Sequence, residues 1–147
     1  ERLGEAVAAM AEKWDETSGS LGDILIPLIA QERYREVFAL LMRDLPFSYA
    51  AQGIIAPEHL QACADCFTDA ERREVLDELN RSGGDRRNKM IALARYLNIR
   101  EAESSLRAIA ENESSGASSR VFACKAIIDI GATRIVYRVL AQPKGRA

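Results

Sequence analysis

The chain has 147 residues, of which 48% are hydrophobic and 29% are charged. This length and balance predict a single domain, residues 1–147, alone or as part of a longer protein, and they exclude an intrinsically disordered chain. The longest apolar runs, at 24–30 and 37–42, are too short to cross a bilayer, so we expect no membrane insertion. Three cysteines, an odd number, argue against a disulfide scaffold and favour a reducing, cytoplasmic environment.

The formal net charge of −2 conceals an uneven distribution along the chain. Residues 1–79 carry 16 acidic and 7 basic side chains, a balance of −9, whereas residues 80–147 carry 6 acidic and 13 basic ones, a balance of +7. Opposite charges on the two halves can attract charged partners or favour head-to-tail self-association. The alternative is that both charged surfaces are simply solvated.

Four helical segments are expected before residue 57. Apolar residues recur at helical spacing from Leu3 to Trp14, and the pattern ends in a turn-forming stretch of Thr, Ser and Gly. Pro27 interrupts the next apolar segment, which predicts a short or kinked helix. The predicted ranges are 3–14, 21–30, 34–42 and a single turn at 49–51.

Six further helices are expected in the rest of the chain. Thr68 and Glu71 have the spacing of an N-terminal capping box. Gly83 and Gly84 end the helix that follows, and Asp85 is positioned to cap the next one. The predicted ranges are 57–67, 70–80, 85–97, 101–112, 119–131 and 133–141. No segment alternates with a period of two, so we predict an all-α fold of about ten helices.

The second half repeats itself weakly at a spacing of 33 residues. Placing Arg87 over Arg120 aligns the apolar positions without a gap, through the turn residues Asn98 and Gly131. The aligned pairs are Met90 and Ala123, Ile91 and Cys124, Leu93 and Ala126, Ala94 and Ile127, Leu97 and Ile130, Ala102 and Ile135, and Leu106 and Val139. A period in this range predicts stacked helical hairpins, none of which can bury its apolar face alone.

The repeated unit has an Arg-x-x-Ala helix that ends at Gly before a second amphipathic helix. Its residues are Arg120, Ala123, Ala126, Ile127, Ile130, Gly131, Ile135 and Val139. Over 87–141 this pattern resembles HEAT-type repeats of the short bacterial form, although Met90 and Asn98 stand where Ala and Gly are expected. The resemblance implies a right-handed α-solenoid of antiparallel hairpins that binds other proteins and carries no catalytic residues.

A second, shorter resemblance lies in the first half of the chain. Residues 36–51 run Glu-Val-Phe-Ala-Leu-Leu-Met-Arg-Asp-Leu-Pro, followed by Tyr-Ala-Ala at the end of the segment. This stretch resembles the helical hairpins of flagellar motor-switch proteins and of magnesium-transporter cytoplasmic domains. It implies the same kind of function, a helical surface that binds other proteins.

The chain contains one histidine, His59, and three cysteines, Cys63, Cys66 and Cys124. Spacings of four and three place the first three on one face of the predicted helix 57–67, and Cys124 would complete a Cys3His zinc site. We favour the alternative that the cysteines pack in the core as small hydrophobic residues, because Cys124 aligns with the apolar Ile91. We therefore expect no cofactor.

Basic side chains cluster in the second half of the chain and form a candidate anion-binding or nucleic-acid-binding surface. The candidates are Arg86, Arg87, Lys89, Arg120 and Lys125. Equivalent positions of stacked helices lie in a row, so Arg87 and Arg120 would form a stripe that holds phosphates. An isoelectric point of about 5.6 and the lack of an aromatic stacking platform argue against nucleic acid, and an acidic protein is the alternative ligand.

The sequence has no convincing catalytic constellation. A single histidine gives no Ser-His-Asp arrangement that can be argued, and the Gly83–Gly84 pair lacks the spacing of a phosphate-binding loop. We therefore expect a non-catalytic adaptor or regulatory module that binds a peptide or helix of another protein on its concave face. The expected contact residues are Arg100, Glu103, Arg107, Arg134, Tyr137 and Arg138.

Overall fold

The computed structural model describes residues 2–14, 21–43 and 57–141, and for 132–141 it describes the backbone alone. The described residues form eight α-helices and two short 3-10 helices and contain no strand, which confirms the all-α prediction but not the expected number of about ten helices. Within the same ranges, no helix combines the length and the apolar character needed to cross a membrane. The predicted turn at 49–51 and much of the segment 36–51 lie outside the described residues.

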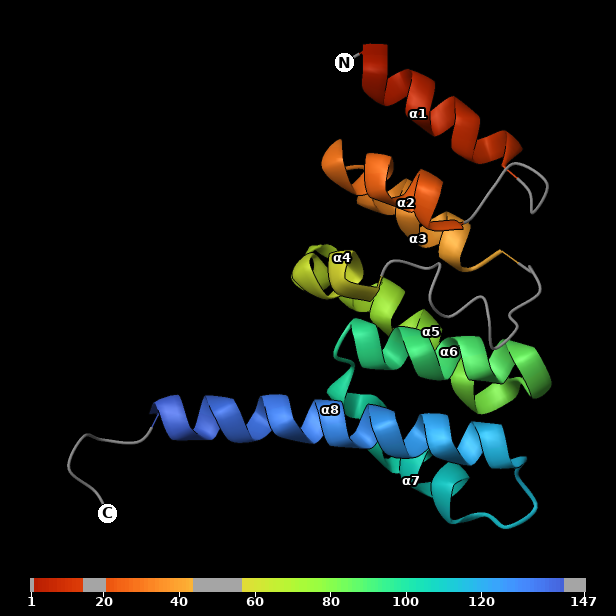
Figure 1. The fold of residues 1–147 in the computed structure, drawn as a ribbon, viewed down its shortest axis with the longest axis vertical. Coiled ribbons are helices and arrows are strands. Elements are labelled where there is room, and N and C mark those ends of the chain that lie inside the picture. Colours follow the sequence, from red (N-terminus) through yellow and green to blue (C-terminus); the bar gives the residue numbers. More distant parts are fainter. Residues whose placement is uncertain (1, 15–20, 44–56, 142–147) are drawn as a thin grey trace.

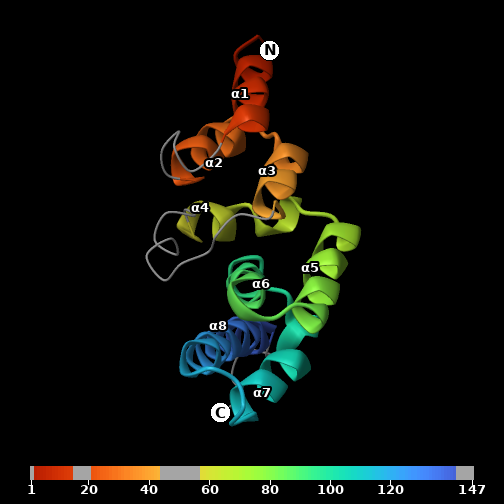
Figure 2. The ribbon, with the colours of Figure 1, turned by 90° about the vertical axis from the view of Figure 1, so that its right-hand side faces the viewer.

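The helices are stacked along the long axis of the molecule, from α1 at one end to α7 and α8 at the other (Figure 1). Figure 2 shows α2, α4, α6 and α8 following one another along one side, with α3, α5 and α7 along the other. The most extensive contacts join α7 to α8, α6 to α8 and α5 to α6; α1, α2 and α3 pack against one another, and α4 makes a smaller contact with α6. The helices are α1 (Arg2–Lys13), α2 (Leu21–Ala30), α3 (Tyr34–Leu41), α4 (Pro57–Ala62), η3 (Ala64–Cys66), α5 (Asp69–Arg81), α6 (Gly84–Tyr96), η4 (Arg100–Ala102), α7 (Glu103–Glu111) and α8 (Ala117–Ala141).

Local signals determine several helix ends. The predicted capping box is present, since the Thr68 hydroxyl accepts from the Glu71 N–H at 3.1 Å and Glu71 accepts from the Thr68 N–H at 2.9 Å. At the end of α6, Asn98 has a φ of 51°, and the Ile99 N–H donates back to the Ala94 carbonyl at 2.9 Å. Asparagine tolerates this left-handed conformation, so Asn98 makes the turn for which glycine was expected.

Helix α6 is the centre of the core. Every residue from Lys89 to Ala94 is buried, and so is Tyr96, which means that the helix is covered on all sides. A helix that is enclosed in this way must contact neighbours in several directions, and α6 packs against α4, α5 and α8. Its burial therefore ties the second half of the chain into one body.

An aromatic cluster joins α3 to the residues that follow α4. The buried Phe67 ring lies 6.2 Å from Tyr34 and 6.3 Å from Phe38, measured between ring centroids. Phe67 reaches this position because the predicted helix 57–67 is interrupted: α4 ends at Ala62, and the 3-10 helix η3 carries the chain onward. The interruption also separates the side chains that a continuous helix would have aligned on one face.

Helix α8 corrects the prediction of a second hairpin. The expected break at Gly131 is absent, and the backbone continues as one helix from Ala117 to Ala141. A single glycine inside a helix costs only about 1 kcal/mol, which the flanking apolar residues readily overcome. The turn that the 33-residue alignment predicts at Gly131 is therefore absent.

The Gly131→Ala substitution tests the continuity of α8. A β-carbon at Gly131 would meet no atom within 4 Å. If Gly131 is helical, alanine should raise the free energy of unfolding by about 0.5–1 kcal/mol, because it reduces the backbone freedom of the unfolded chain.

Gly84→Ala is the matched control, measured in the same urea unfolding experiment. Gly84 also has open space around it, but its φ is +56°. Alanine there should lower the free energy of unfolding by about 1–2 kcal/mol. A loss of stability in Gly131→Ala would contradict a continuous helix.

Candidate functional site

The four candidate metal ligands do not come together. Cys63 is buried, whereas His59, Cys66 and Cys124 are exposed. No three His, Cys, Asp or Glu side chains of the described residues are arranged to hold a metal ion. Burial raises the pKa of the Cys63 thiol, and its Sγ lies 3.6 Å from the Leu60 carbonyl oxygen, so this cysteine behaves as a core residue.

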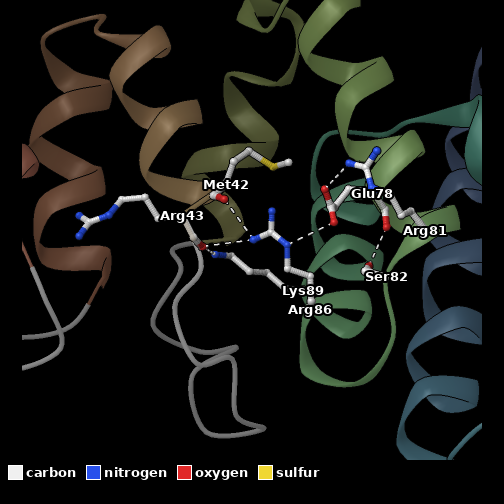
Figure 3. Close-up of polar contacts among 7 residues, drawn as sticks. All are labelled: Met42, Arg43, Glu78, Arg81, Ser82, Arg86 and Lys89. Carbon is white, nitrogen blue, oxygen red and sulfur yellow. Dashed lines mark hydrogen bonds and ion pairs between the residues drawn. The ribbon is translucent and has the colours of Figure 1, made fainter.

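Two of the predicted surface cations, Arg86 and Lys89, instead donate hydrogen bonds to backbone carbonyl oxygens within the fold (Figure 3). The Lys89 ammonium donates to the Arg43 carbonyl oxygen at 2.9 Å, and the side chain is 2% exposed. Arg86 donates to the carbonyl oxygens of Met42 at 3.1 Å and Arg43 at 3.3 Å. These carbonyls lie just beyond the end of α3, where the helix dipole is negative and no helical N–H is left to satisfy them. The prediction that Lys89 is part of an anion-binding surface is therefore wrong.

Glu78 connects this cluster to the end of α5. Its carboxylate accepts from Arg81 at 2.7 Å and lies 3.5 Å from Arg86 Nε (Figure 3). The hydrogen bond from Arg81 and the charges of both arginines hold the pKa of Glu78 below its usual range. Ser82 closes the same helix end, since its hydroxyl donates to the Glu78 carbonyl oxygen at 2.6 Å.

The remaining candidate cations have three different environments. Arg120 Nε donates to the Ala110 carbonyl oxygen at 2.9 Å, near the end of α7. The Nε atom of Arg87 is buried and has no hydrogen-bond partner. Lys125 is exposed on α8. Because most of these side chains bind the backbone or face inward, they do not form the open stripe that phosphates would need.

The six predicted protein-contact residues are only partly described. Arg100 lies on the surface in η4, and Glu103 and Arg107 form an ion pair of 3.5 Å along α7. The backbone of Arg134, Tyr137 and Arg138 belongs to α8, but their side chains are outside the described part of the chain. The contact surface proposed from these residues stays a prediction.

Helix α8 presents a second apolar face that the sequence analysis missed. Val121 is 47% exposed and Ile128 is 66% exposed, with the exposed Cys124 and Lys125 between them. Spacings of three, four and seven residues place the four side chains on one face. The expectation that Cys124 packs in the core is therefore wrong. Its partner in the alignment, Ile91, is 1% exposed, because α6 is covered on the corresponding side, whereas no described residue covers that side of α8.

The exposed face of α8 can be compared with the face of α6 that contacts α8. Arg95 on α6 pairs with Asp129 on α8, and Asn88 accepts from the Ser119 hydroxyl at 2.6 Å. With the 33-residue offset, Asn88 and Arg95 correspond to Val121 and Ile128. The exposed face of α8 is therefore equivalent to the face of α6 that receives α8.

The sequence contains a signal for this face, the i, i+3, i+7 spacing of Val121, Cys124 and Ile128. It was overlooked because a helix 119–131 with a hairpin partner at 133–141 was expected to bury its apolar residues. The same spacing continues in the sequence with Ala132, Ile135 and Val139. This exposed apolar face of α8 is a candidate binding surface.

The substitution Lys89→Met tests the structural role assigned to this buried cation. Methionine keeps the length and packing of the side chain but loses its donor to the Arg43 carbonyl. The free energy of unfolding should fall by about 1–3 kcal/mol, as expected for loss of a hydrogen bond from a charged group. The exposed Lys125→Met control should change stability by less than about 0.5 kcal/mol. An increase in stability for Lys89→Met would show that desolvation of the ammonium outweighs its bonds.

Comparison with known proteins adds no relative to this description. The chain matches no protein-family model, no curated protein and no solved structure. The resemblance to HEAT-type repeats therefore rests on the residues of this chain alone.

Proposed function

We propose that the chain is a non-catalytic protein-binding module of the HEAT-like type, a right-handed stack of helical hairpins. Its exposed α8 face binds an amphipathic helix of another protein. The alternation of helices on two sides of the long axis supports the repeat architecture (Figure 2). The observation that carries the binding function is the exposed apolar stripe of Val121 and Ile128 on the last helix of the stack.

The structure supplies a template for the docking geometry. Helix α8 packs on the face of α6 that contains Ile91 and Ala92, both of which are buried. The equivalent face of α8 has no helix over it within the described residues. A partner helix would therefore pack on α8 in the way that α8 packs on α6. An apolar face that stays exposed within the described residues is a candidate interface.

The chemistry of the face defines the partner. Burial of Val121 and Ile128 would each contribute about 1.5–3 kcal/mol, so the partner needs its own apolar ridge at helical spacing. Lys125 lies in the middle of the face and favours a carboxylate on the partner. A surface ion pair of this kind adds at most about 1 kcal/mol, and it mainly selects the orientation of the bound helix.

Site-specific photo-crosslinking tests this proposal. A photoreactive phenylalanine analogue at Ile128 should capture a segment of another protein that is helical, amphipathic and acidic, identified by mass spectrometry of the crosslinked peptide. The same analogue at Leu3, which is 63% exposed on α1 at the opposite end, is the matched control and should not capture that segment.

An additional Val121→Asp substitution should abolish the Ile128 adduct, because a buried carboxylate opposes docking. Circular dichroism should show unchanged helix content, since Val121 does not belong to the core. Equal capture from Leu3, or an adduct that Val121→Asp leaves intact, would contradict the proposal. Crosslinking of the α8 face to a second copy of this chain would also contradict it, and would assign the face to self-association.

A further inference from the structure

A hollow of about 400 Å³ lies between α5, α6, α7 and the turn before α8. The hollow is open to solvent, and its volume does not distinguish it from two other hollows of about 540 and 500 Å³ on the described surface, so only its lining sets it apart. The lining residues are Leu79, Asn80, Ser82, Arg87, Ser104, Ser105, Ala108, Ile109, Asn112 and Ser115. The hollow is separate from the exposed apolar face of α8, since it contains none of the residues of that face.

The lining combines one cation, six small polar side chains and an apolar part, and it contains no carboxylate. Two other hollows on the described surface differ in this respect. One contains Glu32 and Glu36 beside its arginines, and the other contains Asp69 and Glu101. In those places acidic side chains compete for the arginines, whereas no carboxylate lines the hollow beside Arg87.

The side chain of Arg87 has no hydrogen bond or ion pair with the described residues. Its Nε atom is buried without a hydrogen bond, and its guanidinium forms no ion pair with any described residue. The aligned arginine of the next unit, Arg120, donates its Nε to a backbone carbonyl, and Arg72 and Arg86 also bind backbone carbonyls. The Arg87 side chain as a whole is only partly buried, so the other guanidinium N–H groups, rather than the enclosed Nε, are the donors available to an acceptor from outside the chain.

We propose that this hollow binds a small organic anion, whose carboxylate or phosphate group accepts hydrogen bonds from Arg87. Arginine recognises such planar or multi-oxygen acceptors through several donors at once. The hydroxyls of Ser104 and Ser105 and the amide of Asn80 hydrogen-bond the polar groups of the ligand. Leu79, Ala108 and Ile109 contact its apolar part.

Titration of the whole protein with defined probes tests the proposal. The probes are inorganic phosphate, glycerol 3-phosphate and lactate, with sodium chloride as the control for ionic strength. Proton–nitrogen NMR spectra should show saturable shifts of the Arg87 Nε–H and of the Ser104 and Ser105 amides. A response to the two phosphates assigns the ligand to phosphate esters, and a response to lactate assigns it to carboxylates. Either response supports the proposal, and no saturable shift with any of the three overturns it.

Two variants and one control make the assignment specific. Arg87→Gln should weaken binding of the responding probe at least about tenfold, the factor expected for loss of a charged hydrogen bond, without lowering the melting temperature of the unliganded protein. Ala108→Trp, at an exposed position of α7, should block the hollow while leaving Arg87 in place. Arg107→Gln removes an arginine that pairs with Glu103 on the same helix, and should bind normally. Unchanged binding in Arg87→Gln or in Ala108→Trp would overturn the proposal.

Discussion

Basic side chains that donate to the carbonyl ends of neighbouring helices hold the successive layers of this fold together. Most of these helices are short, and each ends in backbone carbonyls that have no helical N–H to bind. Arg43 donates to the Trp14 carbonyl at 2.8 Å after α1, Lys89 and Arg86 donate to the carbonyls after α3, and Arg72 donates to the Asn98 carbonyl at 2.8 Å after α6. The positive charge and the negative end of each helix dipole stabilise one another, so the layers are joined by polar bonds as well as by the apolar core.

These hydrogen bonds give a structural explanation for part of the basic charge in the second half of the chain. An excess of basic residues in the second half suggests a surface for phosphates when it is counted along the sequence. In the fold, Arg86, Lys89 and Arg120 of this half donate to backbone carbonyl oxygens. Arg87 and Lys125 are the two predicted cations without such a contact, and each belongs to a different proposed site. Arg87 faces a hollow without carboxylates, and Lys125 lies within the exposed apolar face of α8.

The position of a helix in the stack decides which of its faces are buried. Helix α6 packs against α4, α5 and α8, and its middle, from Lys89 to Ala94, is buried, the charged Lys89 included. Helix α8 has the same spacing of apolar residues, but its neighbours cover only one face, which contains Ala123, Ala126 and Ile130. The binding surface that we propose is therefore the face of α8 that no helix covers within the described residues, and it corresponds to the face of α6 that contacts α8.

Local chemistry in the sequence was sufficient to predict the all-α class, the start of α5 at its capping box and the turn at Asn98. Each of these depends on bonds between residues a few positions apart. Tertiary contacts determined the other features. Lys89 is buried because it binds the carbonyl of Arg43, 46 residues away, and Cys124 is exposed because no described helix covers it. The break after α4 accompanies the packing of Phe67 against α3. Helix α8 continues through Gly131 because the packing of the whole helix outweighs the small free-energy cost of one glycine. This packing cannot be predicted from the residues next to Gly131 alone.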